Sequence, residues 1–309
     1  MDKYFLLKNY VDEQFNSKLT INHEIISEDF QKNVLNKLSN DDFIEQLIFL
    51  GYIPDLYKSD SSEETLYTKL TEVMVAEWAN RMGYQGKYVK QKSRYEDVDI
   101  TTAFGTIVCD AKSFRLGRSQ KAPNVKDFVK PEDYRKWLKR HSNGIGGLVA
   151  YPCLHEWTGK SDAFKYCSSH STPIIMLPYK YLAYMLLIKE NHKIEIEKLW
   201  NLSKIFPKEV DNSSDYWEYM NKAVIEATHS SEKELKDFLY KANEIIKKYT
   251  LFNVSYLNNQ KDLILLDIEK SINSINDITT LKENFIQYKE LKETDFLDKI
   301  IKRIKDFRL

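Results

Sequence analysis

The sequence has 309 residues, of which 42% are apolar and 30% charged, and its 46 basic and 46 acidic side chains give a formal net charge of zero. This composition is typical of a packed globular protein and excludes a disordered or collagen-like chain. No run of about 18 apolar residues is present and the first residues do not match a signal peptide, so we expect a cytoplasmic protein that does not associate with membranes.

The first part of the chain is predicted to be helical. Apolar residues recur at helical spacing over residues 24–82, and one helix there opens at Asn40 and closes at Gly51. Ser61 and Ser62 are suited to cap a longer helix, which Gly83 would end. We therefore expect an N-terminal helical region over residues 1–60.

The middle of the chain changes to short strands. Residues 98–102 and 106–111 predict two strands of a hairpin, and residues 147–151 and 173–177 are apolar runs typical of buried strands. A basic helix over residues 131–140 separates the hairpin from the first of these runs. The pattern predicts an α/β fold with a central mixed sheet flanked by helices, in a core that spans residues 61–190.

The last third of the chain, residues 191–309, is predicted to be a C-terminal helical region. Ser231 with Glu234, and Thr280 with Glu283, have the spacing of capping boxes ahead of apolar stripes. These stripes have polar sides of mixed charge, so we expect core or subunit contacts and not a membrane-binding face.

Positive charge is concentrated in one segment. Between Gly86 and Arg140 there are 14 basic and 7 acidic residues, so this segment carries +7 and the rest of the chain −7. Such a segment suits a protein that holds a phosphate backbone at one surface. A solvated basic face without a partner explains the charge equally well.

The clearest candidate site is Asp110-Ala111-Lys112, at the end of the second hairpin strand. Residues two apart on a strand share a face, so Asp110 and Lys112 point the same way. If the hairpin is symmetric about Phe104–Gly105, Asp99 lies opposite Asp110 and Asp97 lies opposite Lys112. Two carboxylates about 5 Å apart need a cation between them, and Mg²⁺ prefers such ligands. This predicts metal-dependent phosphodiester cleavage, with a structural Asp–Lys pair as the alternative.

Three strings around this site carry a resemblance to a known family. They are SSEETLYTK, which begins at Ser61, VCDAKSFRLGR around Asp110, and NVKDF from Asn124. Together they resemble type II restriction endonucleases of the HindIII type, which are nucleases of the PD-(D/E)xK superfamily. The resemblance covers about residues 53–187, and it implies a restriction-endonuclease-like sheet core.

The resemblance also implies the roles of individual residues. The catalytic residues would be Asp110 and Lys112 with Asp99 and Glu64, and Mg²⁺ would be bound by Asp99, Asp110 and Ala111. The interval between the two aspartates is shorter here than in the family, so Asp97 competes with Asp99, and the symmetric turn favours Asp99. Glu64 also suits a simple role as an acid at a helix N-terminus.

The implied function is Mg²⁺-dependent cleavage of double-stranded DNA at a palindromic site by a homodimer, leaving 5′-phosphates, and the similarity suggests the site AAGCTT. The predicted DNA contacts come from one segment and are Arg115, Arg118, Lys121, Asn124, Lys126 and Asp127. Amide and charged side chains of this kind read base edges or hold phosphates. A structure-specific repair or junction nuclease of the same fold, or a DNA-binding protein without activity, remains an alternative.

Overall fold

The computed structural model describes residues 3–17, 21–89, 95–273 and 279–307. Residues 90–94, part of the basic segment, and the side chain of Thr280 lie outside the described part. The elements are, in chain order, η1 (Lys3–Phe5), α1 (Leu6–Ser17), α2 (His23–Asn33), η2 (Leu35–Lys37), α3 (Asn40–Ile48), β1 (Tyr52–Ile53), α4 (Ser62–Arg81), β2 (Gln85–Tyr88), β3 (Val98–Thr102), β4 (Gly105–Ala111), β5 (Phe114–Arg115), α5 (Val125–Phe128), α6 (Pro131–Leu138), β6 (Gly144–Tyr151), α7 (Asp162–Tyr166), β7 (Ile174–Pro178), α8 (Tyr179–Ile188), η3 (Ile196–Trp200), α9 (Leu202–Ile205), α10 (Ser213–Thr228), α11 (Glu232–Asn273) and α12 (Thr279–Lys305).

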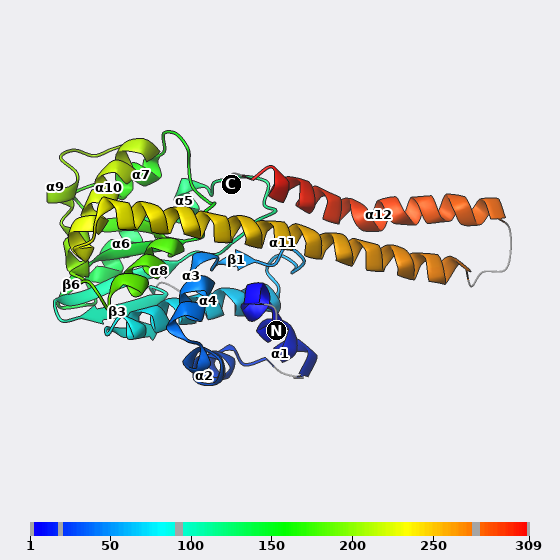
Figure 1. Cartoon of the computed structure of the whole chain (residues 1–309), viewed down its shortest axis with the longest axis horizontal. Coiled ribbons are helices and arrows are strands. Elements are labelled where there is room, and N and C mark those ends of the chain that lie inside the picture. Colours follow the sequence, from blue (N-terminus) through cyan, green and yellow to red (C-terminus); the bar gives the residue numbers. More distant parts are fainter. Residues whose placement is uncertain (1–2, 18–20, 90–94, 274–278, 308–309) are drawn as a thin grey trace.

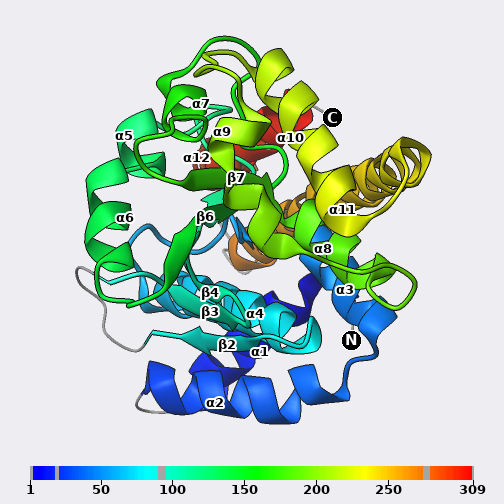
Figure 2. The ribbon, with the colours of Figure 1, turned by 90° about the vertical axis from the view of Figure 1, so that its left-hand side faces the viewer.

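A five-stranded mixed sheet forms the centre of the molecule (Figure 2). Its strand order is β2-β3-β4-β6-β7, in which β2, β3 and β4 pair antiparallel and β4, β6 and β7 pair parallel. The predicted mixed sheet is therefore confirmed. Strand β2 and a separate parallel pair of two-residue strands, β1 and β5, were not predicted.

Helices cover both faces of this sheet. Helix α4 lies so close to β2 that a Cβ on Gly86 would come within 2.0 Å of the Ala76 carbonyl oxygen. On the other face, α6 places the Tyr134 ring where a Cβ on Gly147 would be, at 2.1 Å. Because Gly147 pairs with Val108, α6 covers the face of β4 on which Asp110 also lies.

The predicted helix ends agree well with the structure. The Ser61 side chain caps α4 by accepting a hydrogen bond from the Glu64 amide at 3.3 Å, and Gly83 follows that helix with a φ of +89°. Ser231 and Glu234 form the predicted capping box, since each side chain accepts a hydrogen bond from the other residue's amide. The three cysteines, Cys109, Cys153 and Cys167, are free and buried.

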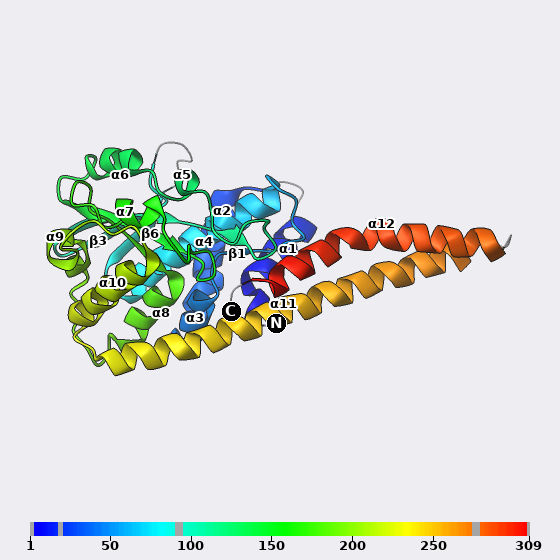
Figure 3. The same cartoon turned by 90° about the horizontal axis from the view of Figure 1, so that it is seen from above.

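Helices α11 and α12 form an antiparallel hairpin that projects far beyond the sheet core (Figures 1 and 3). The base of the hairpin is packed into the protein through a second hydrophobic cluster, in which Ile300 and Ile304 of α12 join Tyr52 and Leu116. No helix in the described part of the chain is long and apolar enough to cross a membrane.

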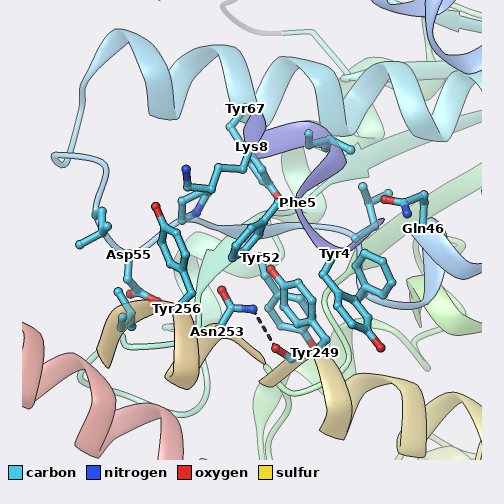
Figure 4. A pocket seen from close by; sticks show the side chains of 16 residues that line it. Tyr4, Phe5, Lys8, Gln46, Tyr52, Asp55, Tyr67, Tyr249, Asn253 and Tyr256 are labelled. Atoms are coloured by element: carbon cyan, nitrogen blue, oxygen red, sulfur yellow. Dashed lines mark hydrogen bonds between the residues drawn. The ribbon is translucent and has the colours of Figure 1, made fainter. Parts of the chain in front are cut away.

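A small cavity lies where the N-terminal segment meets α11 (Figure 4). Its volume is about 30 Å³, and its walls include Tyr4, Tyr52 and Tyr249. Tyr52 and Tyr249 stack with ring centroids 5.4 Å apart. A space of this size holds about one water, so it is a packing gap and not a substrate site.

Candidate active site

The pairing of the β3–β4 hairpin decides which acids meet, and it differs from the symmetric turn that the sequence suggested. Val98 pairs with Cys109 and Thr102 with Gly105, so the two turn residues are Ala103 and Phe104. Asp99 lies opposite Val108, so the prediction that it faces Asp110 is wrong. Extending the same register by one residue beyond the pair of Val98 and Cys109 brings Asp97 to Asp110.

The turn is displaced because Gly105 serves as the first residue of β4. It has a φ of +147°, and a Cβ there would come within 2.1 Å of the Asn143 carbonyl oxygen. Only glycine fits this close approach of the segment that leads into β6. The glycine signal in the sequence therefore reflects strand packing and not the centre of the turn.

Asp97 directly precedes β3 and reaches across the end of β4. Its carboxylate Oδ2 accepts a hydrogen bond from the Ala111 amide at 2.9 Å, and its own amide donates to the Cys109 carbonyl at 3.0 Å. Burial and the neighbouring Asp110 and Glu72 raise the pKa of Asp97 well above its usual value. The crowded negative charge is what a bound cation would relieve.

Asp110 and Lys112 lie on the same side of the chain, as their spacing predicted, and they form an ion pair with 2.7 Å between Oδ2 and Nζ. Burial lowers the pKa of Lys112, but Asp110 and Asp97 offset this effect, so the pKa is raised overall. The backbone is held as well, because the Lys112 amide donates to Ala150 at 2.8 Å and its carbonyl accepts from the Tyr179 hydroxyl at 2.8 Å. The lysine therefore presents a fixed positive charge beside the acids.

The helical acid of this site is Glu72 of α4, which sequence reasoning missed. It is 6% exposed, forms an ion pair with Lys69, and contributes to the raised pKa values of Asp97 and Cys109. A charged residue within the buried helical run LTEVMVAEW was the signal that could have identified it.

Glu64, the helical acid proposed from the sequence, has other partners. Its carboxylate accepts from the Asp60 amide at 2.7 Å and lies 3.0 Å from an Arg115 guanidinium nitrogen. These contacts fit the alternative role of an acid at a helix N-terminus.

Asp99 belongs to a separate cluster with Glu96 and His141. The His141 Nε2 lies 2.9 Å from Glu96 Oε1 and 3.3 Å from Asp99 Oδ1, and Arg140 approaches the other oxygen of Glu96 at 3.2 Å. Burial and the nearby Glu96 raise the pKa of Asp99 to about 6. The ligand atoms of the three residues lie within 4.8 Å of one another, so this cluster could also hold a metal ion.

The segment after β5 carries the predicted DNA contacts. Arg115 is committed to the protein, because its guanidinium donates to the carbonyls of Pro54 at 2.9 Å and Tyr57 at 2.7 Å besides pairing with Glu64. Arg118 is half-buried over the Phe114 ring, and its Nη1 has no hydrogen-bond partner among the described residues. Arg118 therefore makes fewer polar contacts with the rest of the described protein than Arg115.

The remaining residues of the segment are exposed. They are Lys121, Asn124, Lys126 and Asp127. Asn124 is the N-cap of α5, and its side-chain oxygen accepts from the Lys126 amide at 3.1 Å, which leaves the amide NH₂ without a contact in the cap. Asp127 contributes to the raised pKa of Lys112, so the end of this segment lies within electrostatic reach of Lys112.

Comparison with known proteins identifies the family of the chain. The family model for the HindIII restriction endonuclease matches residues 16–282. The curated type II restriction enzyme HindIII of Haemophilus influenzae is 27% identical over 276 residues, which cover 84% of this chain and 88% of that protein. The family match spans the sheet, Asp97, Asp110, Lys112 and α11, and it ends in the first turn of α12. On this evidence the chain belongs to the HindIII restriction endonuclease family, whose members are nucleases that act on DNA.

Proposed function

We propose that this chain is a Mg²⁺-dependent type II endonuclease that cuts both strands of double-stranded DNA at a specific sequence and leaves 5′-phosphates. The observation that carries the proposal is the meeting of Asp97, Asp110 and Lys112 at the end of β4. A structure-specific nuclease of the same fold is less favoured. The family match extends over residues 118–127, which are proposed to contact DNA and are called the recognition segment below, as well as over the site.

The chemistry of the donor set fits magnesium. Asp97 and Asp110 offer hard carboxylate oxygens, with Glu72 within electrostatic reach. Burial is the largest cause of the raised pKa of Asp97, and the charges of Asp110 and Glu72, which a divalent ion would neutralise, raise it further. Ala111 stays a predicted ligand between them. When bound, the ion supplies positive charge that stabilises the phosphate under attack.

The residues of the chain supply a further positive charge and hold the acids and the lysine in position. The raised pKa of Lys112 keeps its side chain protonated at neutral pH, so it holds positive charge beside Asp110 instead of accepting a proton. The Ala111 amide fixes the Asp97 carboxylate. Tyr179 and Ala150 fix the backbone of Lys112, and the ion pair with Asp110 holds its side chain beside the acids.

Recognition is proposed to come from the segment that follows. Arg118 and Lys121 would hold phosphates, while Asn124, Lys126 and Asp127 would read base edges. AAGCTT is the site that the resemblance suggests.

The proposal includes a homodimer, because two copies related by a dyad present the same site to both strands of a palindrome. The projecting hairpin offers a surface for the second copy, since it exposes large apolar side chains, namely Leu251, Leu263, Leu266, Phe285, Tyr288, Leu291 and Phe296. At about 100 Å² each they approach the roughly 800 Å² per partner of a standard interface.

The test is digestion of a sequenced supercoiled plasmid in Mg²⁺, in Ca²⁺ and in EDTA, followed by mapping of the ends. Cleavage at one sequence, only in Mg²⁺ and with 5′-phosphate ends, is the expected result. Asp110→Asn is the control for a contaminating nuclease. Cleavage that follows DNA branches would instead indicate a structure-specific nuclease, and retardation of the DNA without any cut in Mg²⁺ would indicate a binding protein.

A further inference from the structure

The recognition segment starts at a residue whose backbone is held on both sides. Gly117 follows β5 by two residues and precedes Arg118. Its amide lies 3.1 Å from each carboxylate oxygen of Asp55, and its carbonyl accepts a hydrogen bond from Arg303 Nη1 at 2.9 Å. Asp55 lies on the loop after β1, at the wall of the small cavity in Figure 4, and Arg303 lies in the last turns of α12.

The side-chain packing at this point leaves no room for adjustment. A Cβ on Gly117 would come within 2.7 Å of both Asp55 Oδ1 and Ile300 Cγ2. The preceding residue, Leu116, is 1% exposed and belongs to the cluster formed with Ile300 and Ile304 of α12. The origin of the segment is therefore enclosed by the β1 loop on one side and by the C-terminal helix on the other.

We propose that Asp55 and Arg303 are positioning residues for sequence recognition, because together they fix the point from which residues 118–127 extend toward DNA. The inference rests on the proposed function, in which that segment contacts bases and phosphates. It gives the last turns of α12, at the base of the projecting hairpin, a role in sequence recognition in addition to their role in packing.

The charges of the clamp support this role. Burial raises the pKa of Asp55 to about 6, while the Gly117 amide, Arg115 and Arg303 favour the ionised form. Burying a carboxylate costs free energy unless hydrogen bonds and opposite charges compensate for the lost water. Here the carboxylate holds one peptide group of a loop, and a loop that reads bases must be held within a fraction of an ångström.

A purely structural role predicts a different outcome from a positioning role. If the clamp only stabilises the fold, its loss lowers the melting temperature and weakens binding to every DNA by the same factor. If the clamp aims the segment, its loss weakens binding to the cognate sequence and leaves binding to scrambled DNA unchanged, because non-specific binding depends on charge and not on exact position.

The test uses the full-length protein with the Arg303→Ala, Arg303→Lys and Lys302→Ala variants. Lys302 is the matched control, since it is an exposed cation on the same helix. Affinity is measured in Ca²⁺ on a duplex with the mapped site and on a scrambled duplex. We expect Arg303→Ala to lower the ratio of the two affinities by about tenfold, Arg303→Lys to restore part of it, and Lys302→Ala to leave it unchanged.

An unchanged ratio in a folded Arg303→Ala protein would overturn the inference. If Arg303→Ala does not fold, the pair Asp55→Ala and Asp55→Asn decides, because asparagine keeps an acceptor for the Gly117 amide and should preserve more of the ratio than alanine. Failure of the proposed function is distinguishable, since the wild type itself would then show no preferred site.

Discussion

Replacing Asp97 and Asp99 one at a time by asparagine tests which of the two aspartates belongs to the active site. Asp97→Asn should retain the fold, because the amide oxygen of asparagine can still accept from the Ala111 amide, 2.9 Å from the carboxylate. It removes one of two anionic ligands proposed for the metal. Stabilisation of this kind amounts to several kcal/mol, and about 1.4 kcal/mol corresponds to a factor of ten, so cleavage should fall at least about a hundredfold.

Asp99→Asn is the matched control, since Asp99 lies two residues along the chain but faces Val108. It should retain cleavage within about fivefold, because it alters only the cluster with Glu96 and His141. The assay is single-turnover cleavage of a duplex that carries the mapped site, over a range of Mg²⁺ concentrations. Activity in Asp97→Asn together with loss of activity in Asp99→Asn would refute the reasoning and place the ion in the Glu96 cluster.

The same variants make a second, metal-free comparison possible. The folded state raises the pKa of Asp97, so this group stabilises the protein at low pH, and that stability is lost as the pH rises through the raised value. In EDTA, Asp97→Asn should therefore raise the melting temperature relative to the wild type more at pH 8 than at pH 5. An equal effect at both values would contradict the crowding of Asp97 with Asp110.

Four further predictions follow from other contacts. Lys112→Ala should reduce cleavage at least about a hundredfold and lower the melting temperature, because it leaves Asp110 without its partner at 2.7 Å; wild-type cleavage would exclude a role in the site. The folded state raises the pKa of Asp55 to about 6, so the free energy of unfolding of the wild type should fall by up to about 3 kcal/mol as the pH rises from about 4 to 6. Asp55→Asn should flatten this pH dependence in urea unfolding. Asn124→Ser keeps a capping oxygen but loses the side-chain amide, so the binding free energy in Ca²⁺ should weaken by about 1–3 kcal/mol on the cognate duplex alone. Lys121→Ala should weaken binding to all duplexes. Equal losses on cognate and scrambled duplexes for Asn124→Ser would argue against base readout. Leu291→Lys, at an apolar side chain of the hairpin that is 67% exposed, should shift the protein toward monomer in analytical ultracentrifugation, and an unchanged dimer would locate the interface elsewhere.

Local signals in the sequence predicted four of the central strands and the long helices. The caps at Ser61 and Ser231 satisfy free amides by side-chain contacts within three residues, so their identity is written in short patterns. The hairpin strands and the Asp110–Lys112 pair follow from a period of two for the same reason. The short pair β1 and β5 could not be predicted from the sequence, because strands of two residues show no periodicity.

The site itself was predicted only in part, because its geometry depends on contacts between distant segments. A shift of the turn by one residue moved Asp97, and not Asp99, to Asp110, and the cause was the Asn143 carbonyl 38 residues beyond Gly105. No local pattern reports such a contact. Glu72 was missed for a related reason, since the apolar helical run holds two buried acids, Glu72 and Glu77, and only the position of the sheet distinguishes them.

Recognition and catalysis are joined by a short, rigid length of chain. Lys112 is fixed by Ala150 and Tyr179, Arg115 by Pro54 and Tyr57, and the next fixed point is Gly117. These anchors hold the segment that reads DNA at a fixed position relative to the lysine, so a poorly fitting sequence would shift the bound phosphate and leave Lys112 beside Asp110. Because the reaction tolerates little misplacement of the phosphate, a wrong base should lower the cleavage rate more than it lowers affinity. Comparing single-turnover rates with affinities in Ca²⁺ over all one-base variants of the site measures this coupling, and proportional losses in both would show that the two functions are independent.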